Sequence, residues 1–320
     1  MSFEEIKVLL EINGKESQVF LPNEIFDDLQ GYITNGAQLA YAYSYLYLTQ
    51  FLYRNCKYFD NKTLIDGNII KQVLGYSESN RTMNYITKKG GLLDSIGYTE
   101  TTKDIPLSWD FKKDDGEGLS FYMSSNVEKG TLDIPKIFFL KKPLKAFERT
   151  LEHVDKDGLI TEEEMQGTFY NVTQTHSVDF DVFMYCMANK EIGTTGFYLY
   201  SWLKHKNEIF SGYDVSYEKL SDETGLPRRT MIQYLDALKS YRLIRFKFNQ
   251  EYFALGMYKE ERKATTYYTN SYSEFFDKPE PFKRISNMPR KEYFDMKEQE
   301  RAKLVIQVPK VKIDISELPF

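Results

Sequence analysis

The segment from residue 216 to residue 240 restricts the fold of this chain more than any other. Ser216 has a side chain typical of a helix N-cap, and Gly225 stands where a left-handed residue ends a helix. The Leu-Pro pair at 226–227 then imposes an extended residue followed by a fixed φ, from which a second helix starts. The sequence therefore predicts two short helices joined by a tight turn.

The second of these helices is predicted to have one apolar face and one mostly polar face. Met231, Leu235 and Leu238 recur at helical spacing and form a narrow apolar stripe. The other face carries Arg228, Arg229, Ile232, Gln233, Asp236 and Lys239. Residues 243–248 and 252–255 are predicted to be two strands around a short polar turn, so a β-hairpin is expected to follow the helix.

This region is basic although the chain as a whole is acidic. The 320 residues include 42 lysines and arginines against 47 aspartates and glutamates, a net charge of −5. Between residues 226 and 248 the balance reverses, because Asp236 alone opposes the basic residues Arg228, Arg229, Lys239, Arg242, Arg245 and Lys247. A local positive excess on an exposed helix favours contact with the phosphate backbone of a nucleic acid.

Residues 217–245 resemble the winged helix-turn-helix family of DNA-binding proteins. The resemblance rests on a Lys-Leu-Ser-Asp-Glu-Thr-Gly-Leu helix and turn, an Arg-Arg-Thr start of the next helix, a Leu-x-x-Leu stripe and a Leu-Ile entry to the following strand. In that family the first helix crosses the DNA backbone and the second lies in the major groove. Winged helices also serve as protein–protein modules, so a dimerisation role is the alternative.

The resemblance implies a set of DNA-contacting residues in this part of the chain. Arg228 or Arg229 is expected to pair with guanine and Gln233 with adenine. Arg245 and Lys247, on the strand after the helix, are expected to contact phosphates. The full predicted set here is Arg228, Arg229, Thr230, Gln233, Lys239, Arg242, Arg245 and Lys247.

An earlier segment shows a similar order of predicted elements. Helices are expected at residues 37–58, 63–74 and 81–89, followed by strands at 92–98 and 105–111. The tripeptide Arg81-Thr82-Met83 recurs as Arg229-Thr230-Met231 after a glycine that ends the preceding helix. This recurrence predicts a tandem duplication. The first copy offers a second DNA contact through Arg81, Thr82, Asn84, Lys88 and Lys89, or equally a dimerisation interface.

We therefore expect an α+β protein, mainly helical, with two tandem winged-helix domains. A short N-terminal β-hairpin is predicted from residues 6–12 and 18–21 around the Asn13-Gly14 turn, and a charged C-terminal tail is predicted to hold a helix near 290–303 and a strand-like end. The expected division is an N-terminal winged-helix-like domain at 1–145, an acidic linker at 146–180, a C-terminal DNA-binding domain at 181–268 and the tail at 269–320.

The composition argues against several other classes of protein. No apolar run approaches the ~20 residues of a membrane helix. Cys56 and Cys186 are far apart, which suits a reducing cytoplasm and excludes a disulfide scaffold. The histidines, His153, His176 and His205, are too scattered to support a metal centre or a covalent tyrosine nuclease. We expect no enzymatic activity, no cofactor and no metal.

Residues 153–164 imitate a calcium-binding loop without meeting its requirements. The glycine and the final Glu164 are in place, but His153 occupies the first position, where the loop needs aspartate. The same residues suit a loop leading into a helix, with Thr161 as its cap and the acids at 162–164 in its first turn. We therefore expect no divalent ion there.

Tandem winged helices on a chain of this size resemble the replication initiators of plasmids and phages. That resemblance implies a cytoplasmic, sequence-specific binder of double-stranded DNA that recognises origin repeats, together with self-association and contacts to host replication proteins. The alternative is a transcriptional regulator with the same DNA-reading parts, acting with host transcription proteins. A third class is a partner-binding protein that retains the fold without DNA. No membrane partner is expected.

Overall fold

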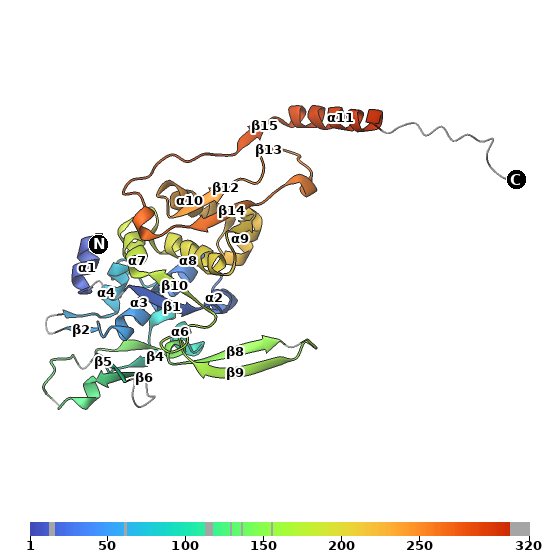
Figure 1. The fold of residues 1–320 in the computed structure, drawn as a ribbon. Coiled ribbons are helices and arrows are strands. Elements are labelled where there is room, and N and C mark those ends of the chain that lie inside the picture. Colours follow the sequence, from blue (N-terminus) through green and yellow to red (C-terminus); the bar gives the residue numbers. More distant parts are fainter. Residues whose placement is uncertain are drawn as a thin grey trace, which may run out of the picture.

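The computed structural model describes residues 1–12, 17–60, 63–112, 118–128, 130–135, 137–154 and 156–307. Two long helices, α3 (Gly36–Arg54) and α8 (Gly193–Ile209), pack against each other at the centre of the molecule (Figure 1). The side chain of Asn35 caps α3 by accepting hydrogen bonds from the amides of Ala37 and Gln38. No proline interrupts either helix, and α3 is buried along most of its length.

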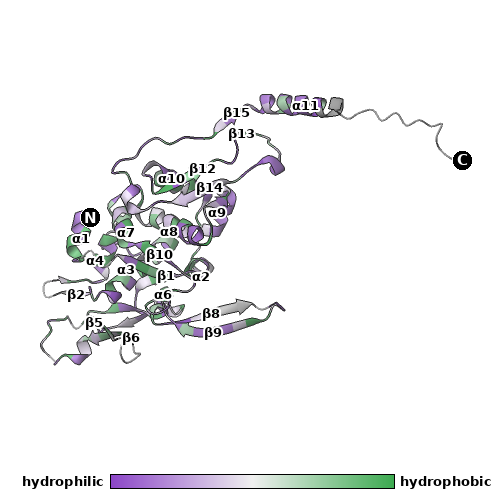
Figure 2. Cartoon of the chain, in the orientation of Figure 1, coloured by the Kyte–Doolittle hydropathy of each residue, from purple (hydrophilic) through white to green (hydrophobic). Residues whose placement is uncertain are grey.

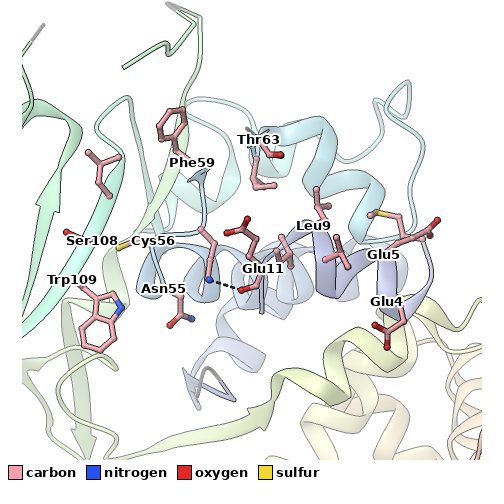
Figure 3. A pocket seen from close by; sticks show the side chains of 16 residues that line it. Glu4, Glu5, Leu9, Glu11, Asn55, Cys56, Phe59, Thr63, Ser108 and Trp109 are labelled. Carbon is pink, nitrogen blue, oxygen red and sulfur yellow. Dashed lines mark hydrogen bonds between the residues drawn. The ribbon is translucent and has the colours of Figure 1, made fainter. Parts of the chain in front are cut away.

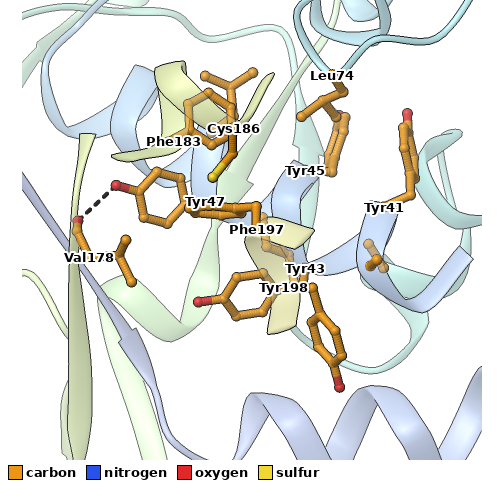
Figure 4. Packing of buried hydrophobic residues seen from close by; sticks show 14 of the residues in the cluster. Tyr41, Tyr43, Tyr45, Tyr47, Leu74, Val178, Phe183, Cys186, Phe197 and Tyr198 are labelled. Carbon is orange, nitrogen blue, oxygen red and sulfur yellow. Dashed lines mark hydrogen bonds between the residues drawn. The ribbon is translucent and has the colours of Figure 1, made fainter. Parts of the chain in front are cut away.

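Aromatic rings fill the space between these two helices. The ring of Tyr47 meets that of Phe197 edge to face at 4.9 Å between centroids. The Tyr47 hydroxyl donates to the carbonyl of Val178, 2.8 Å away, so this buried polar group is satisfied (Figure 4). The same hydrophobic cluster runs from Ile6 to Tyr267 and therefore includes both halves of the chain. The apolar ribbon segments accordingly gather in the body of the molecule (Figure 2).

The second half folds largely as its sequence predicts, with a difference in the sheet. Helix α9 (Tyr217–Thr224) and helix α10 (Arg228–Ser240) lie in the chain between two strands of an antiparallel sheet of order β11-β14-β12. The strands are β11 (Tyr213–Val215), β12 (Ile244–Lys247) and β14 (Thr265–Thr269). The predicted hairpin between the strands at 243–248 and 252–255 is wrong. β14 pairs with β12, because its Tyr267 is drawn fully into the core, whereas β13 (Tyr252–Ala254) pairs in parallel with β15 (Ser286–Met288).

The first half does not repeat this arrangement. Helices α4 (Gly67–Val73), α5 (Asn84–Thr87) and α6 (Leu92–Ser95) are short, and α6 replaces the strand expected at 92–98. Separate two-stranded antiparallel sheets follow: β4 (Thr99–Thr102) with β7 (Leu140–Pro143), and β5 (Pro106–Lys112) with β6 (Gly118–Met123). The expectation of two tandem winged-helix domains is therefore wrong, and so is the duplication behind it. The apolar residues of 92–96 are spaced for one helical turn between two glycines. A run of this length is compatible with either a short helix or a short strand.

The N-terminus also differs from its prediction. Residues 6–12 do not form a strand; α1 (Phe3–Leu9) is a helix with a Ser2–Glu5 capping box, and it buries Ile6. β1 (Gln18–Pro22) pairs with the distant β10 (Thr175–Asp179) rather than with residues 6–12. The predicted turn at Asn13-Gly14 lies outside the described residues. The N-terminal β-hairpin is therefore wrong, because the capping box and long-range pairing outweigh the local turn signal.

Residues 148–154 and 160–166 form an antiparallel pair of strands that projects from the body (Figure 1). Its strands are β8 (Glu148–Val154) and β9 (Ile160–Gln166). Thr161 and the three acids after it lie on β9, so the helix expected to start there is wrong. Pairing with β8 satisfies the backbone of this segment, which a one-turn helical signal cannot outweigh.

The tail contains the predicted helix, α11 (Arg290–Gln307), which extends away from the body (Figure 1). A second small cluster of Ala254, Met257 and Tyr293 holds its first turns. The strand-like end expected beyond residue 307 lies outside the described residues. No helix in the described ranges is long and apolar enough to cross a bilayer. The remaining elements are α2 (Ile25–Tyr32), β2 (Phe59–Asp60), β3 (Thr63–Leu64), η1 (Ser124–Asn126), η2 (Leu144–Ala146), α7 (Phe180–Ala188), η3 (Lys259–Glu261) and η4 (Tyr272–Glu274).

Candidate nucleic-acid interface

The turn between α9 and α10 is built as its sequence indicates. The Ser216 hydroxyl accepts a hydrogen bond from the amide of Lys219, 3.2 Å away, and so caps α9. Gly225 ends α9 at φ +64°, a backbone conformation that a side chain would strain. Pro227, at φ −53°, leads directly into α10. The turn therefore fixes the start of α10 relative to α9.

Helix α10 divides into a buried and an exposed face. Met231, Leu235 and Leu238 are fully buried. Arg228, Arg229 and Gln233 are exposed, and Thr230 is half-buried. In the described part of the chain neither Arg228 nor Arg229 forms an ion pair with a carboxylate. The first two turns of α10 thus present two unneutralised guanidinium groups and an amide to solvent.

Lys239 does not belong to this exposed face, although the sequence places it there. Its side chain is buried, and its ammonium group pairs with Asp236 at 3.1 Å. Aromatic rings surround the ammonium at 5.2–5.7 Å, namely those of Tyr217, Phe246, Tyr267 and Phe282. Phe282 comes from a segment more than forty residues away in sequence, so the helical pattern alone gave no sign of this burial.

The other predicted contacts of this region lie where α10 ends and β12 runs. Arg242, Arg245 and Lys247 are all exposed. Arg242 has φ +57°, and its guanidinium lies 5.2 Å from the centre of the Phe276 ring. Arg245 and Lys247 alternate with the half-buried Phe246 along β12 and therefore share one face of the strand.

The segment around α5 exposes most, but not all, of the side chains predicted to contact DNA. Arg81, Thr82, Lys88 and Lys89 are exposed. The side chain of Asn84 instead points inward and accepts a hydrogen bond from the Lys71 ammonium at 2.7 Å. Because α5 has only four residues, it is too short to lie in a groove as a reading helix does. This segment is a polar, basic surface turn rather than a second reading helix.

The start of α3 lies beside both basic segments. The backbone of Gly36 lies against Leu226 and Pro227, in the turn before α10. Two residues later, the Gln38 side chain donates to the carbonyl of Thr82 at 3.4 Å and accepts from the Tyr85 hydroxyl at 2.9 Å. A cleft of about 670 Å³ also opens near the start of α3, and its lining includes Ala37, Ser77 and Tyr234. The fold therefore brings residues 81–89 and the start of α10 to the same end of α3.

Buried polar residues that the sequence analysis missed support these surfaces. The Lys71 ammonium also donates to the carbonyl of Asn80 at 2.9 Å, and the Lys141 ammonium donates to the carbonyl of Lys88 at 3.0 Å. Lys141 is paired with Asp94 at 2.7 Å. Asn270 contacts both Arg242 and Arg245. No local motif marks these residues, because each contacts another segment, from nine to more than fifty positions away in the sequence.

A larger groove lies elsewhere and has the opposite charge. It has a volume of about 1060 Å³ and lies between α1 and the strands β2, β3 and β5 (Figure 3). Glu4, Glu5 and Glu11 line it together with apolar residues such as Leu9 and Trp109. The Lys57 ammonium crosses the groove to the carbonyl of Glu11, 2.9 Å away. Its acidic rim is unsuited to a nucleic acid.

His176 and His205 are buried in the core among aromatic side chains. His176 contacts the Tyr43 hydroxyl at 2.8 Å and the Asn23 side chain at 3.1 Å. Burial, and then the nearby His205, hold the pKa of His176 well below its usual value. Burial likewise lowers the pKa of His205 to about 4. Both side chains are therefore neutral near pH 7. Among the residues that the structure describes, His, Cys, Asp and Glu form no cluster suited to a metal ion.

Comparison with known proteins adds no family to this description. Neither the protein-family models nor the curated proteins nor the solved structures yield a match to the chain.

Proposed function

We propose that this protein binds double-stranded DNA in a sequence-specific manner through α10. The observation that carries the proposal is the start of α10, where Arg228 and Arg229 in the first turn and Gln233 in the second are exposed after the turn that ends α9. Arginine pairs bidentately with guanine and glutamine with adenine in the major groove. A helix start held by a second helix is the geometry that places such side chains at base edges.

The remaining exposed cations suit phosphate contacts. Arg242, Arg245 and Lys247 follow the reading helix, and Arg81, Lys88 and Lys89 lie toward the same end of α3. Phosphate contacts orient a protein on the duplex without reading its sequence. Lys239 is left out of the proposed interface because it is buried, and Asn84 because its side chain is engaged by Lys71.

The test compares base-reading with phosphate-contacting variants on a cognate and a random duplex across a salt series. Arg228→Ala with Arg229→Ala should cost about 1–3 kcal/mol per base contact on the cognate duplex and little on the random one. Lys247→Ala should weaken both alike and lower the salt slope by about one unit. Unchanged specific affinity in the double arginine variant would remove α10 as the reader.

Within this class we propose a replication initiator that binds origin repeats in the cytoplasm. Its support is the resemblance of residues 217–245 to the winged helix-turn-helix family alone, because the short helices α5 and α6 do not repeat that unit in the first half of the chain. Footprinting on the parent replicon tests this assignment. Protection over an array of repeats is the expected result, whereas protection of a single promoter would instead indicate a transcriptional regulator. If the wild-type chain binds no duplex at low salt, the DNA role fails and a partner-binding protein remains.

A further inference from the structure

Asn270 lies directly after β14 and is 2% exposed. Its side-chain amide donates to the carbonyl of Arg242 at 2.8 Å, and its side-chain oxygen accepts from Nε of Arg245 at 2.7 Å. Only one orientation of the amide satisfies both bonds, because a carbonyl cannot donate and Nε–H cannot accept. Asn270 therefore links the end of α10 to a side chain of β12.

The backbone of Asn270 is itself held on both sides. Its amide donates to the carbonyl of Leu243 at 2.9 Å, and its carbonyl accepts from the Tyr200 hydroxyl at 2.8 Å. Tyr200 belongs to the buried helix α8. The position of the Asn270 side chain is thus fixed by the core rather than by the surface that it touches.

Arg242 needs this support because of its backbone conformation. At φ +57° it occupies the left-handed region, which non-glycine residues adopt only when the surroundings hold them there. The bond from Asn270 to its carbonyl and the Phe276 ring beneath its guanidinium provide such support. Arg242 directs the chain from the end of α10 into β12.

Arg245 is exposed, yet its side chain is anchored at Nε. The Tyr268 ring, opposite it on β14, lies 6.0 Å from the centre of its guanidinium. In the described ranges no carboxylate pairs with Arg245. Its two terminal NH₂ groups are therefore left for an external anion, in the planar fork that suits a phosphate.

We propose that Asn270 is a positioning residue that presets Arg245 to bind a phosphodiester group of the DNA backbone. The inference rests on the proposed DNA-binding function. An arginine already held in its binding geometry loses less side-chain freedom on binding than one that is free to rotate. Asn270 itself does not contact the DNA. It acts through Arg245, and its contribution should disappear when the guanidinium is removed.

A double-mutant cycle tests this dependence with a random-sequence duplex, on which base reading plays no part. Arg245→Ala should weaken binding about tenfold and lower the salt slope by about one unit. Asn270→Ala should weaken binding by about three- to fivefold. Because Asn270 also holds the backbone of Arg242, the cycle is run in an Arg242→Gly background, where glycine tolerates the positive φ and the second arginine is absent. There Asn270→Ala should have no further effect once Arg245→Ala is present. Additive losses would overturn the proposal, because a merely structural asparagine would act independently of Arg245.

Arg245→Lys provides a test that leaves Asn270 intact. It keeps the positive charge but lacks the guanidinium fork, so its affinity should fall toward that of Arg245→Ala. Wild-type affinity in Arg245→Lys would overturn the preset geometry even if Asn270→Ala fails to fold. Failure of the proposed function would look different from failure of this inference. If the proposed function is wrong, the wild-type chain binds no duplex. If only this inference is wrong, the wild-type chain still binds the duplex with its usual salt dependence.

Discussion

The backbone of Gly36 lies directly against the ring of Pro227: a Cβ at Gly36 would stand 2.9 Å from Pro227 Cδ. Gly36 is the first residue of α3, and Pro227 is the last residue before α10. The contact therefore joins the central helix to the turn that starts the proposed reading helix. Only a residue without a side chain allows this approach.

Gly36→Ala is expected to destabilise the protein by about 1–3 kcal/mol, because the methyl group forces α3 and the turn apart. Gly31→Ala is the matched control, since Gly31 lies within α2 and no atom beyond its chain neighbours and the backbone of that helix lies within 4 Å of its Cβ position. The control should be neutral or more stable by up to about 1 kcal/mol. Urea unfolding measures both changes, and equal effects would contradict the close packing at Gly36.

Lys71→Met should destabilise the segment around α5. The ammonium of Lys71 holds the side chain of Asn84 and the carbonyl of Asn80, and methionine can replace neither hydrogen bond. We expect a loss of about 1–3 kcal/mol and faster amide exchange in residues 78–90. Lys89→Met, at an exposed position, is the control and should leave both unchanged. Unaltered exchange in Lys71→Met would show that the segment holds its shape without this lysine.

The stability of the protein should fall as the pH is lowered from 6.5 toward 4. The folded pKa of His205 is about 4, below its ordinary value of 6.5, so the unfolded chain binds the proton first. The stability that neutral His205 contributes is therefore complete above pH 6.5 and is lost as the pH falls. Burial also lowers the pKa of His176, so this histidine contributes in the same direction. Each histidine lowers the free energy of unfolding by at most about 1.4 kcal/mol for each pH unit of this fall.

His205→Gln isolates this effect from the titration of the carboxylates. The variant loses the stacking of His205 on Phe26 at every pH, but that loss does not depend on protonation. Urea unfolding between pH 7.5 and 4.5 should show a shallower decline for His205→Gln than for the wild type. Parallel curves would mean that the pKa of His205 in the folded protein is the ordinary pKa of a histidine.

Tyr293→Ala should release α11 without weakening the main core. Tyr293 is fully buried in the small cluster of residues 254 and 257, and its hydroxyl donates to Glu261 at 2.9 Å. This cluster is separate from the core around α3 and α8. Amide exchange should rise in residues 290–300 and stay unchanged in α8. A matching rise in α8 would show that the two clusters unfold together.

The α9–turn–α10 unit was predictable because its signals are local. Ser216, Gly225 and Pro227 each restrict the backbone through their own chemistry, and the Met231 stripe has a single helical period. The exposure of Arg228, Arg229 and Gln233 followed from the same period. The sequence thus determined the place of the candidate reading helix and most of its exposed side chains.

Only the tertiary structure decided which distant segments meet. β1 pairs with β10 and β12 with β14, while α6 takes the place of an expected strand, because a short apolar run fits either element until a partner is available. The sequence predicts Lys239 to be an exposed cation, but in the structure it is buried, with Phe282 among the rings that cover it. Asn270 gained its contacts with Arg242 and Arg245 in the same way. Burial and long-range pairing depend on residues far apart in the chain, and periodicity in the sequence carries no information about them.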